Sequence, residues 1–253
     1  MNPWHYLLIG IGAFLAGGVN ALAGGGTLIT FPLLTAMGLP AVIANITNTV
    51  ALCPGYFGAT LAQWKEISAQ KNRLWFYLPV VILGGVLGGI LLVYTGEHSF
   101  RTLVPYLILL ASIILALGNP LRAWLNHSKE NRQAKYGLKF AGILALLAAA
   151  VYGGYFGAGL SVIFLAVLGL FVDDSLTRLN ALKQILALAT NVAAAIFFVF
   201  SGNVNWGVAL VMAVFALAGG AAGGKLAGRI NATVLRWVIV GIGLAVSVYY
   251  FIK

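Results

Sequence analysis

Apolar stretches of membrane-spanning length recur along the whole chain, and short segments between them carry most of the charge. An α-helix needs about 20 mainly apolar residues to cross a bilayer, because it rises only about 1.5 Å per residue. Of the 253 residues, 61% are hydrophobic and 8% are charged, whereas about 25% charged residues are usual in soluble domains. The runs are continuous and lack the alternating polarity of barrel strands, so the sequence predicts an all-α integral membrane protein.

Run lengths predict about ten membrane segments, namely eight full spans and two short half-helices. The expected segments are 6–23, 27–37, 41–63, 74–94, 103–117, 140–152, 160–172, 175–201, 206–226 and 231–252. The half-helices are 27–37 and 160–172, since neither is long enough to cross alone. The polar connection after the fifth segment divides the chain into a first half, 1–118, a cytoplasmic linker, 119–139, and a second half, 140–253.

The two halves share a sequence pattern. Gly84-Gly85-Val86-Leu87-Gly88-Gly89 recurs as Gly219-Gly220-Ala221-Ala222-Gly223-Gly224, and the same interval superposes Asn45 on Asn180. Small residues four positions apart let helix backbones approach closely in lipid, so both glycine motifs predict helix packing. Five segments in each half is an odd number, which predicts two inverted repeats of five.

Basic residues indicate the orientation. The formal net charge is +10, and in the inverted arrangement the loops 64–73, 118–139, 173–178 and 225–229 all lie on one side. The positive-inside rule places that side in the cytoplasm, and we expect Arg236 to extend back to the same surface. If the half-helices only dipped into the bilayer, the repeats would be parallel and the linker's charges would lie on the opposite side from 64–73.

A glycine run precedes each half-helix, and a polar stripe follows it on the next span. A helix that begins inside the membrane directs free N–H groups and the positive end of its dipole at the midplane, which suits an anion. Glycine lets the anion approach those amides. The residues predicted to bind substrate are Gly24, Gly25, Gly26, Thr27, Asn45, Asn48, Thr49, Gly157, Gly159, Ser161, Asn180, Lys183, Gln184 and Asn191.

Each of these features has an alternative interpretation. The glycine runs could form only tight turns or close helix contacts. The amides and hydroxyls of Asn45, Asn48, Thr49 and Gln184 could join helices by hydrogen bonds. Lys183 lies near Arg178 in sequence and could extend to the cytoplasmic surface instead of facing a binding site.

The sequence offers little for catalysis or metal binding. All five acidic residues and all three histidines lie in predicted loops or at span edges. The spans therefore lack paired carboxylates, a zinc site and a carboxylate proton relay, and neither Gly-x-Ser-x-Gly nor His-Glu-x-x-His occurs. We expect a protein that is not an enzyme, has no cofactor and does not bind nucleic acid, since its positive charge reports membrane orientation. The single cysteine, Cys53, excludes an intrachain disulfide.

At these residues the chain resembles the sulfite exporter TauE/SafE family, also called the TSUP membrane permeases. The resemblance is carried by Gly17-Gly18-Val19-Asn20-Ala21-Leu22-Ala23-Gly24-Gly25-Gly26-Thr27-Leu28-Ile29-Thr30-Phe31-Pro32-Leu33-Leu34, by Ala44-Asn45-Ile46-Thr47-Asn48-Thr49 and by a second copy at 153–184. In that copy, Gly157-Ala158-Gly159 and Leu165 replace the family's glycine triplet and helix proline.

The resemblance implies a secondary carrier in the cytoplasmic membrane. Its substrate would be a small anion such as sulfite, a sulfonate or another sulfur-containing or organic acid. Two inverted halves predict alternating access, for which H+ or Na+ is a candidate coupling ion. An anion channel of the same architecture is the alternative function.

Overall fold

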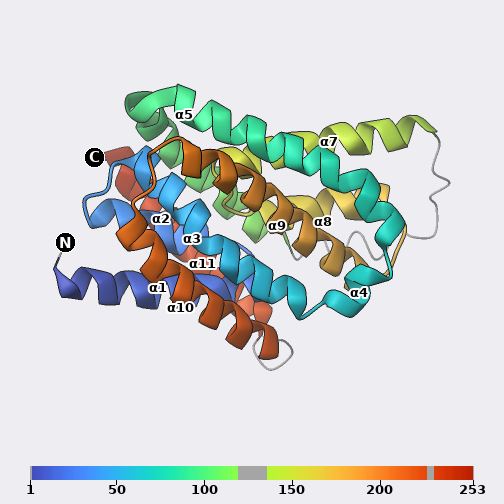
Figure 1. The fold of residues 1–253 in the computed structure, drawn as a ribbon, viewed down its shortest axis with the longest axis horizontal. Coiled ribbons are helices and arrows are strands. Elements are labelled where there is room, and N and C mark those ends of the chain that lie inside the picture. The colour runs from blue at the N-terminus through green and yellow to red at the C-terminus, as the bar shows by residue number, and fades with distance from the viewer. Residues whose placement is uncertain (1, 119–135, 227–230, 253) are drawn as a thin grey trace.

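The structure, a computed structural model, describes residues 2–118, 136–226 and 231–252 and contains only helices in these parts (Figure 1). The helices are α1 Pro3–Leu22, α2 Thr27–Ala36, α3 Ala41–Leu61, α4 Trp64–Ser68, α5 Lys71–Ala116, α7 Tyr136–Tyr155, α8 Leu160–Phe171, α9 Leu176–Phe200, α10 Trp206–Lys225 and α11 Ala232–Ile252. The predicted all-α class is therefore confirmed.

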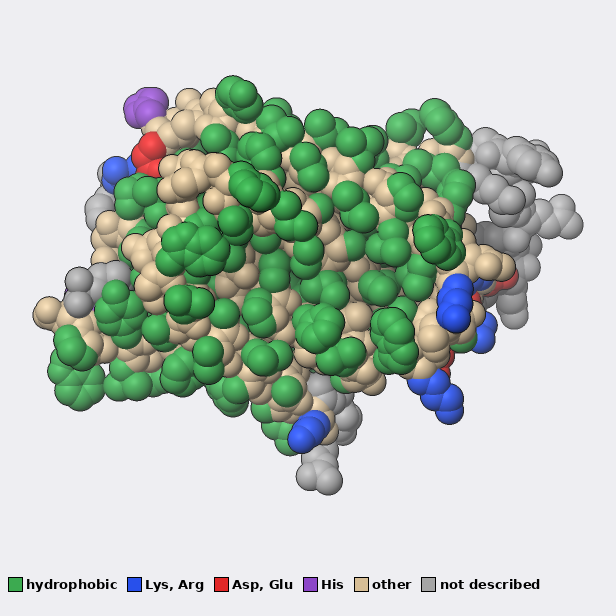
Figure 2. Space-filling view, viewed as in Figure 1, with side chains coloured by type: hydrophobic (Ala, Val, Ile, Leu, Met, Phe, Trp, Pro, Cys, Tyr) green, Lys and Arg blue, Asp and Glu red, His purple; other side chains and the backbone are tan. Residues whose placement is uncertain are grey.

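The outer surface is apolar along the length of the helices. By length and composition α1, α5, α9, α10 and α11 are suited to cross a bilayer. Large side chains such as Trp75 and Phe200 are more than four-fifths exposed, and Figure 2 shows hydrophobic side chains covering most of one face. Such a surface is stable only in lipid, so the structure indicates a multi-pass membrane protein.

α5 consists of two helices joined at a sharp bend. Gly96 has φ 72° and ψ 166°, a conformation that glycine adopts readily. Figure 1 shows the chain reversing at this end, where the N- and C-termini also lie. Directly after the bend, the Glu97 carboxylate accepts hydrogen bonds from the amides of Ala41 at 2.5 Å and Val42 at 2.9 Å. Glu97, predicted to be a loop residue, therefore caps the N-terminus of α3.

Several helices are longer than predicted, because the predicted segments were defined by apolar content alone. Helical structure begins at Lys71 instead of residue 74, resumes after Gly96 instead of at 103, and begins at Tyr136 inside the predicted linker. The remainder of that linker, 119–135, lies outside the described residues. Polar first turns extend beyond the hydrocarbon region, where water and headgroups solvate them.

The prediction for Arg236 was wrong. Its side chain is only 1% exposed, and the guanidinium lies against Gly118 near the end of α5. It therefore packs within the protein and does not extend to the surface.

Helices of the two halves pack reciprocally. α1 and α3 lie against α10, α7 and α9 lie against the first helix of α5, and α3 contacts α9. A Cβ atom built on Gly88 would lie 2.1 Å from the Val151 carbonyl oxygen, and one on Gly219 would lie 1.9 Å from that of Phe14. Both glycine motifs thus bring backbones into direct contact, which confirms the predicted packing role.

We expect Gly88→Ala and Gly219→Ala each to lower unfolding stability by about 1–3 kcal/mol or more, because the methyl group would displace a helix backbone. Gly241→Ala is the matched control, since nothing lies within 4 Å of its Cβ position. It should maintain or raise stability, because alanine favours helix. Thermal unfolding in detergent measures all three, and equal losses would contradict the packing role.

Candidate functional site

The glycine run before α2 meets the first turn of α8. Gly24 has φ 79° and Gly157 has φ 77°, so the chain turns before each half-helix through a conformation that favours glycine. A Cβ atom built on Gly24 would lie 3.1 Å from the Cβ of Ser161. The N-terminal ends of the two half-helices therefore come together, although they lie far apart in the sequence.

The polar stripe on α3 holds these half-helices in place. The Asn48 amide donates to the Thr27 hydroxyl at 3.4 Å and accepts from the Thr30 hydroxyl at 2.5 Å. The Asn45 amide donates to the Tyr155 carbonyl at 2.8 Å, next to the second glycine run. Asn48 thus joins α3 to α2 by hydrogen bonds, which is the alternative role considered for it from the sequence. The Thr49 hydroxyl donates within α3, to the carbonyl of Asn45 at 3.0 Å.

α9 contributes the second set of predicted residues. Lys183 is 2% exposed and Gln184 is fully buried, so neither side chain extends to the surface. Asn191 is buried beside the second glycine run, with its Oδ1 3.9 Å from a Cβ built on Gly157. Asn180 is the one predicted site residue that is only half-buried, and its amide donates to Gln63 Oε1 at 3.1 Å, beyond the end of α3.

Three predicted residues hold buried polar atoms without a hydrogen-bond partner among the described residues. They are Gln184, at both amide atoms, Asn45, at Oδ1, and Ser161, at Oγ. An unsatisfied buried polar atom costs about 1–3 kcal/mol, so such atoms are retained where they bind something. These atoms are free to form hydrogen bonds with a small polar ligand.

Three further residues of this region were not predicted from the sequence. Asn20, near the end of α1, accepts the amide of Gly26 through Oδ1 at 2.8 Å. Thr30 bonds both to Asn48 and to the Gly26 carbonyl, at 3.2 Å. Tyr56, on α3, is buried beside Ser161. A polar residue at the end of an apolar span, directly before a glycine run, is the signal that would have identified Asn20.

The site is enclosed by aromatic side chains toward the end where the termini lie. Phe31 of α2 packs on Phe156, which precedes the second glycine run, with ring centroids 5.4 Å apart. Phe100 completes the cluster, at 6.3 Å from each of them. All three side chains are almost fully buried.

Asn20→Leu should lower unfolding stability by about 1–3 kcal/mol, because it leaves the buried Gly26 amide without an acceptor. Asn2→Leu is the control, since Asn2 is exposed and its side chain makes no cap bond to α1. Thermal unfolding in detergent would distinguish the two variants. If both lose the same stability, the bond from Gly26 contributes nothing specific.

Comparison with known proteins places the chain among membrane transporters. The family model for the sulfite exporter TauE/SafE matches residues 9–250. A probable membrane transporter protein of Haemophilus influenzae is 27% identical over 227 residues, covering 90% of this chain and 87% of the relative. No solved structure matches the chain significantly.

Two other relatives have similar names and coverage. The probable membrane transporter protein YfcA of Escherichia coli K12 is 27% identical over 238 residues, covering 93% of this chain and 85% of the relative. The probable membrane transporter protein ORF9 of a Sinorhizobium species is 25% identical over 242 residues, covering 94% and 89%.

Proposed function

The chain belongs to the sulfite exporter TauE/SafE family and is a membrane transporter, and we propose that it moves a small anion across the cell membrane by alternating access. The observation that carries this proposal is the meeting of the two half-helix ends, with Gly24 against Ser161. The substrate would be sulfite, a sulfonate or a related sulfur-containing or organic acid. The membrane would be the inner, cytoplasmic one.

Convergent helix N-termini favour an anion for electrostatic reasons. The first amides of α2 and α8 precede the intrahelical hydrogen-bond ladder, and each helix dipole places partial positive charge at the same point. Discontinuous helices of transporters bind anions in this way. Lys183 adds a basic side chain to the buried interior, and Gln184 and Asn45 would add amide groups that orient polar atoms of the substrate.

Helix directions support two inverted repeats of five segments. α9 begins beside the end of α3, where Asn180 bonds to Gln63, and it ends beside the start of α3, where the Asn205 amide donates to the Thr47 hydroxyl at 3.0 Å. α3 and α9 occupy corresponding places in the two halves and run antiparallel, as inversion requires. α10 packs on α1 and α3 of the first half, and α5 packs on α7 and α9 of the second half, as expected if the halves are related by inversion.

Contacts between the halves close both ends of the site, which suits a carrier. The Phe31, Phe100 and Phe156 cluster lies toward one end, and the Asn180–Gln63 bond lies toward the other. A carrier exposes its site to one side at a time by rocking one half against the other, so each set of contacts would break in turn. H+ or Na+ would couple this motion to a gradient.

An anion channel is the alternative, and transport kinetics distinguish it. Purified protein in liposomes loaded with unlabelled sulfite should accumulate labelled sulfite transiently, with a rate that saturates. Flux that increases linearly with concentration, without counterflow, would instead identify a channel.

Lys183→Met should weaken anion binding by tenfold or more, about 1.4 kcal/mol, since it keeps an apolar side chain of similar length but removes the charge. Lys183→Arg should retain partial transport, because charge remains while the donor geometry changes. Lys225→Met is the control, as Lys225 is exposed at the end of α10. Counterflow at varied sulfite concentration gives the KM. An unchanged KM and rate in Lys183→Met would remove Lys183 from the site.

Cysteine labelling tests the inverted arrangement in a Cys53→Ser background. Single cysteines at Lys71 and Lys225 should react with impermeant thiol reagents only from the cytoplasm. Cysteines at His98 and Asn203 should react only from outside, because inversion places corresponding loops on opposite sides. If the Lys71 and Asn203 positions react from the same side, the halves are not inverted.

A further inference from the structure

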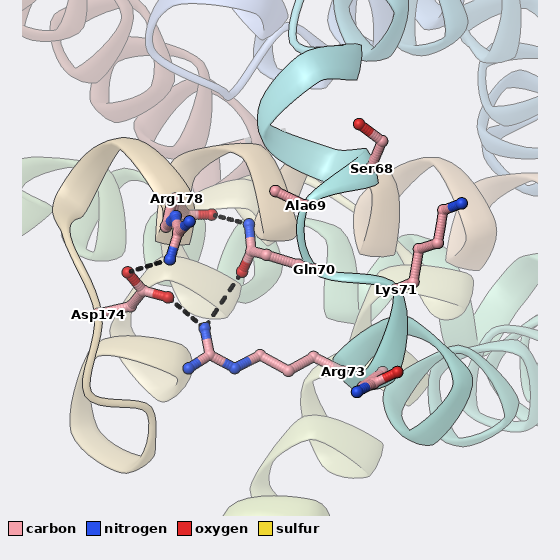
Figure 3. A pocket seen from close by; sticks show the side chains of 8 residues that line it. Ser68, Ala69, Gln70, Lys71, Arg73, Asp174 and Arg178 are labelled. Carbon is pink, nitrogen blue, oxygen red and sulfur yellow. Dashed lines mark hydrogen bonds and ion pairs between the residues drawn. The ribbon is translucent and has the colours of Figure 1, made fainter.

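A polar pocket lies at the end of the molecule opposite the two termini, away from the glycine runs (Figure 3). Its volume is about 420 Å³, and it lies between the start of α5 and the turn from α8 to α9. The lining residues are Ser68, Ala69, Gln70, Lys71, Asn72, Arg73, Asp174 and Arg178. We propose that this pocket is a second anion site, which binds an oxyanion of the phosphate, sulfate or sulfonate type.

The charges that line the pocket favour an anion. Lys71, Arg73 and Arg178 contribute three cations, and among the described lining residues Asp174 is the one carboxylate. The Arg73 guanidinium forms an ion pair with Asp174 and also donates to Gln70 Oε1 at 3.3 Å. Two positive charges therefore remain without a matching negative charge in the lining. Figure 2 shows that Lys and Arg side chains gather at this end.

Asp174 holds the two guanidinium groups in position. Its carboxylate lies between Arg73 and Arg178, with Arg178 Nη1 3.8 Å from Oδ1. Desolvation acts against ionisation, but the Arg73 hydrogen bond and charge, the Ser175 amide and Arg178 together hold the pKa of Asp174 below its usual value. The carboxylate is thus charged at neutral pH and occupies only part of each guanidinium, which has five N–H donors in a planar fork.

Backbone dipoles add to the side-chain charge. Residues 70–73 form the N-cap and first turn of α5, and Ser175 caps the N-terminus of α9 directly beside Asp174. Both helices are long, and their N-terminal ends carry partial positive charge toward the same region. Lys71 makes no ion pair with any described residue, so its ammonium adds a point charge at this opening.

The pocket is open to ligands from two sources. The side chains of Arg73 and Arg178 are 36% and 47% exposed, so a soluble oxyanion could reach them. The pocket also lies at the helix ends, where a bilayer places the phosphate of an anionic lipid such as phosphatidylglycerol. Arginine forks bind the oxygens of either group bidentately, and the shared chemistry is a tetrahedral oxyanion.

The two walls of the pocket come from different halves of the chain. Gln70 Nε2 donates to the Arg178 carbonyl at 3.0 Å, and Arg73 and Asp174 pair across the same boundary. An anion bound to Lys71 and Arg178 would add a third connection between the halves. A bound anion would therefore hold this end closed. It would affect transport although it does not bind at the site beside the glycine runs.

A cysteine placed in the pocket reports on it directly. In full-length Cys53→Ser protein, Ser68→Cys is treated with anionic sulfonatoethyl or cationic trimethylammonioethyl methanethiosulfonate in phosphatidylcholine vesicles. The ratio of the anionic to the cationic reaction rate should be about tenfold or more higher than at an uncharged site, because the pocket concentrates anions. Inorganic sulfate should slow it if the ligand is a soluble anion. Phosphatidylglycerol in the vesicles should slow it without sulfate if the ligand is a lipid headgroup.

Charge-neutralising variants separate the pocket from general surface charge. Lys71→Gln with Arg178→Gln should abolish both the preference for the anionic reagent and the protection by sulfate or lipid. Lys65→Gln is the control, because Lys65 is exposed on neighbouring α4 and does not line the pocket. Lys71→Gln alone breaks no ion pair among the described residues, and it should partly reduce both the preference for the anionic reagent and the protection. The proposal would be overturned if the cysteine reacted equally fast with both reagents and neither sulfate nor lipid slowed the reaction. It would also be overturned if Lys65→Gln changed the reaction rates as much as the double variant does. Both outcomes are independent of the transport assay.

Discussion

The structure depends on two short helices, α2 and α8, whose N-terminal ends are buried inside the protein. Water does not solvate a buried helix end, so each unpaired amide there needs a partner from the protein or a ligand. At α2, Asn20 accepts the Gly26 amide, and the Asn48 amide bonds to the first turn. At α8 the Leu160 amide donates to the Gly157 carbonyl at 3.3 Å, and the Tyr152 hydroxyl donates to the nearby Ala158 carbonyl at 2.8 Å. These bonds hold the two helix ends in place, with Gly24 next to the Ser161 side chain.

Close packing of the surrounding helices is what keeps these ends buried. The two GGxxGG motifs bring backbones into contact where side chains would hold them apart, so α1 and α7 lie tightly against α10 and α5. Lipid provides no hydrophobic force between helices, and contact of small residues replaces it. The glycine motifs therefore act on the site at a distance, because separation of these helices would admit lipid to unsatisfied backbone groups.

Much of this arrangement could be predicted because lipid restricts the possibilities. Apolar run length identified the α-helical segments, and the spacing of Gly84 and Gly219 identified the packing faces. The ends of helices could not be predicted from apolar content, since the first turn of α5 at Lys71 is polar and still helical. Partners far apart in the sequence also left no local signal. The Glu97 cap on the start of α3 and the position of Arg236 against Gly118 both required the tertiary structure.

In the proposed carrier, the contacts at the two ends of the molecule differ in chemistry, so the two ends would open at different cost. Near the termini the closure is apolar, through Phe31, Phe100 and Phe156, and its opening would expose aromatic surface. At the other end the closure is polar, through Asn180–Gln63 and Arg73–Asp174, and water can replace those bonds. Hydrogen bonds and exposed ion pairs contribute little net stability in water, so the polar end should open at lower cost. An anion held among Lys71, Arg73 and Arg178 would raise that cost, since it links the same two walls.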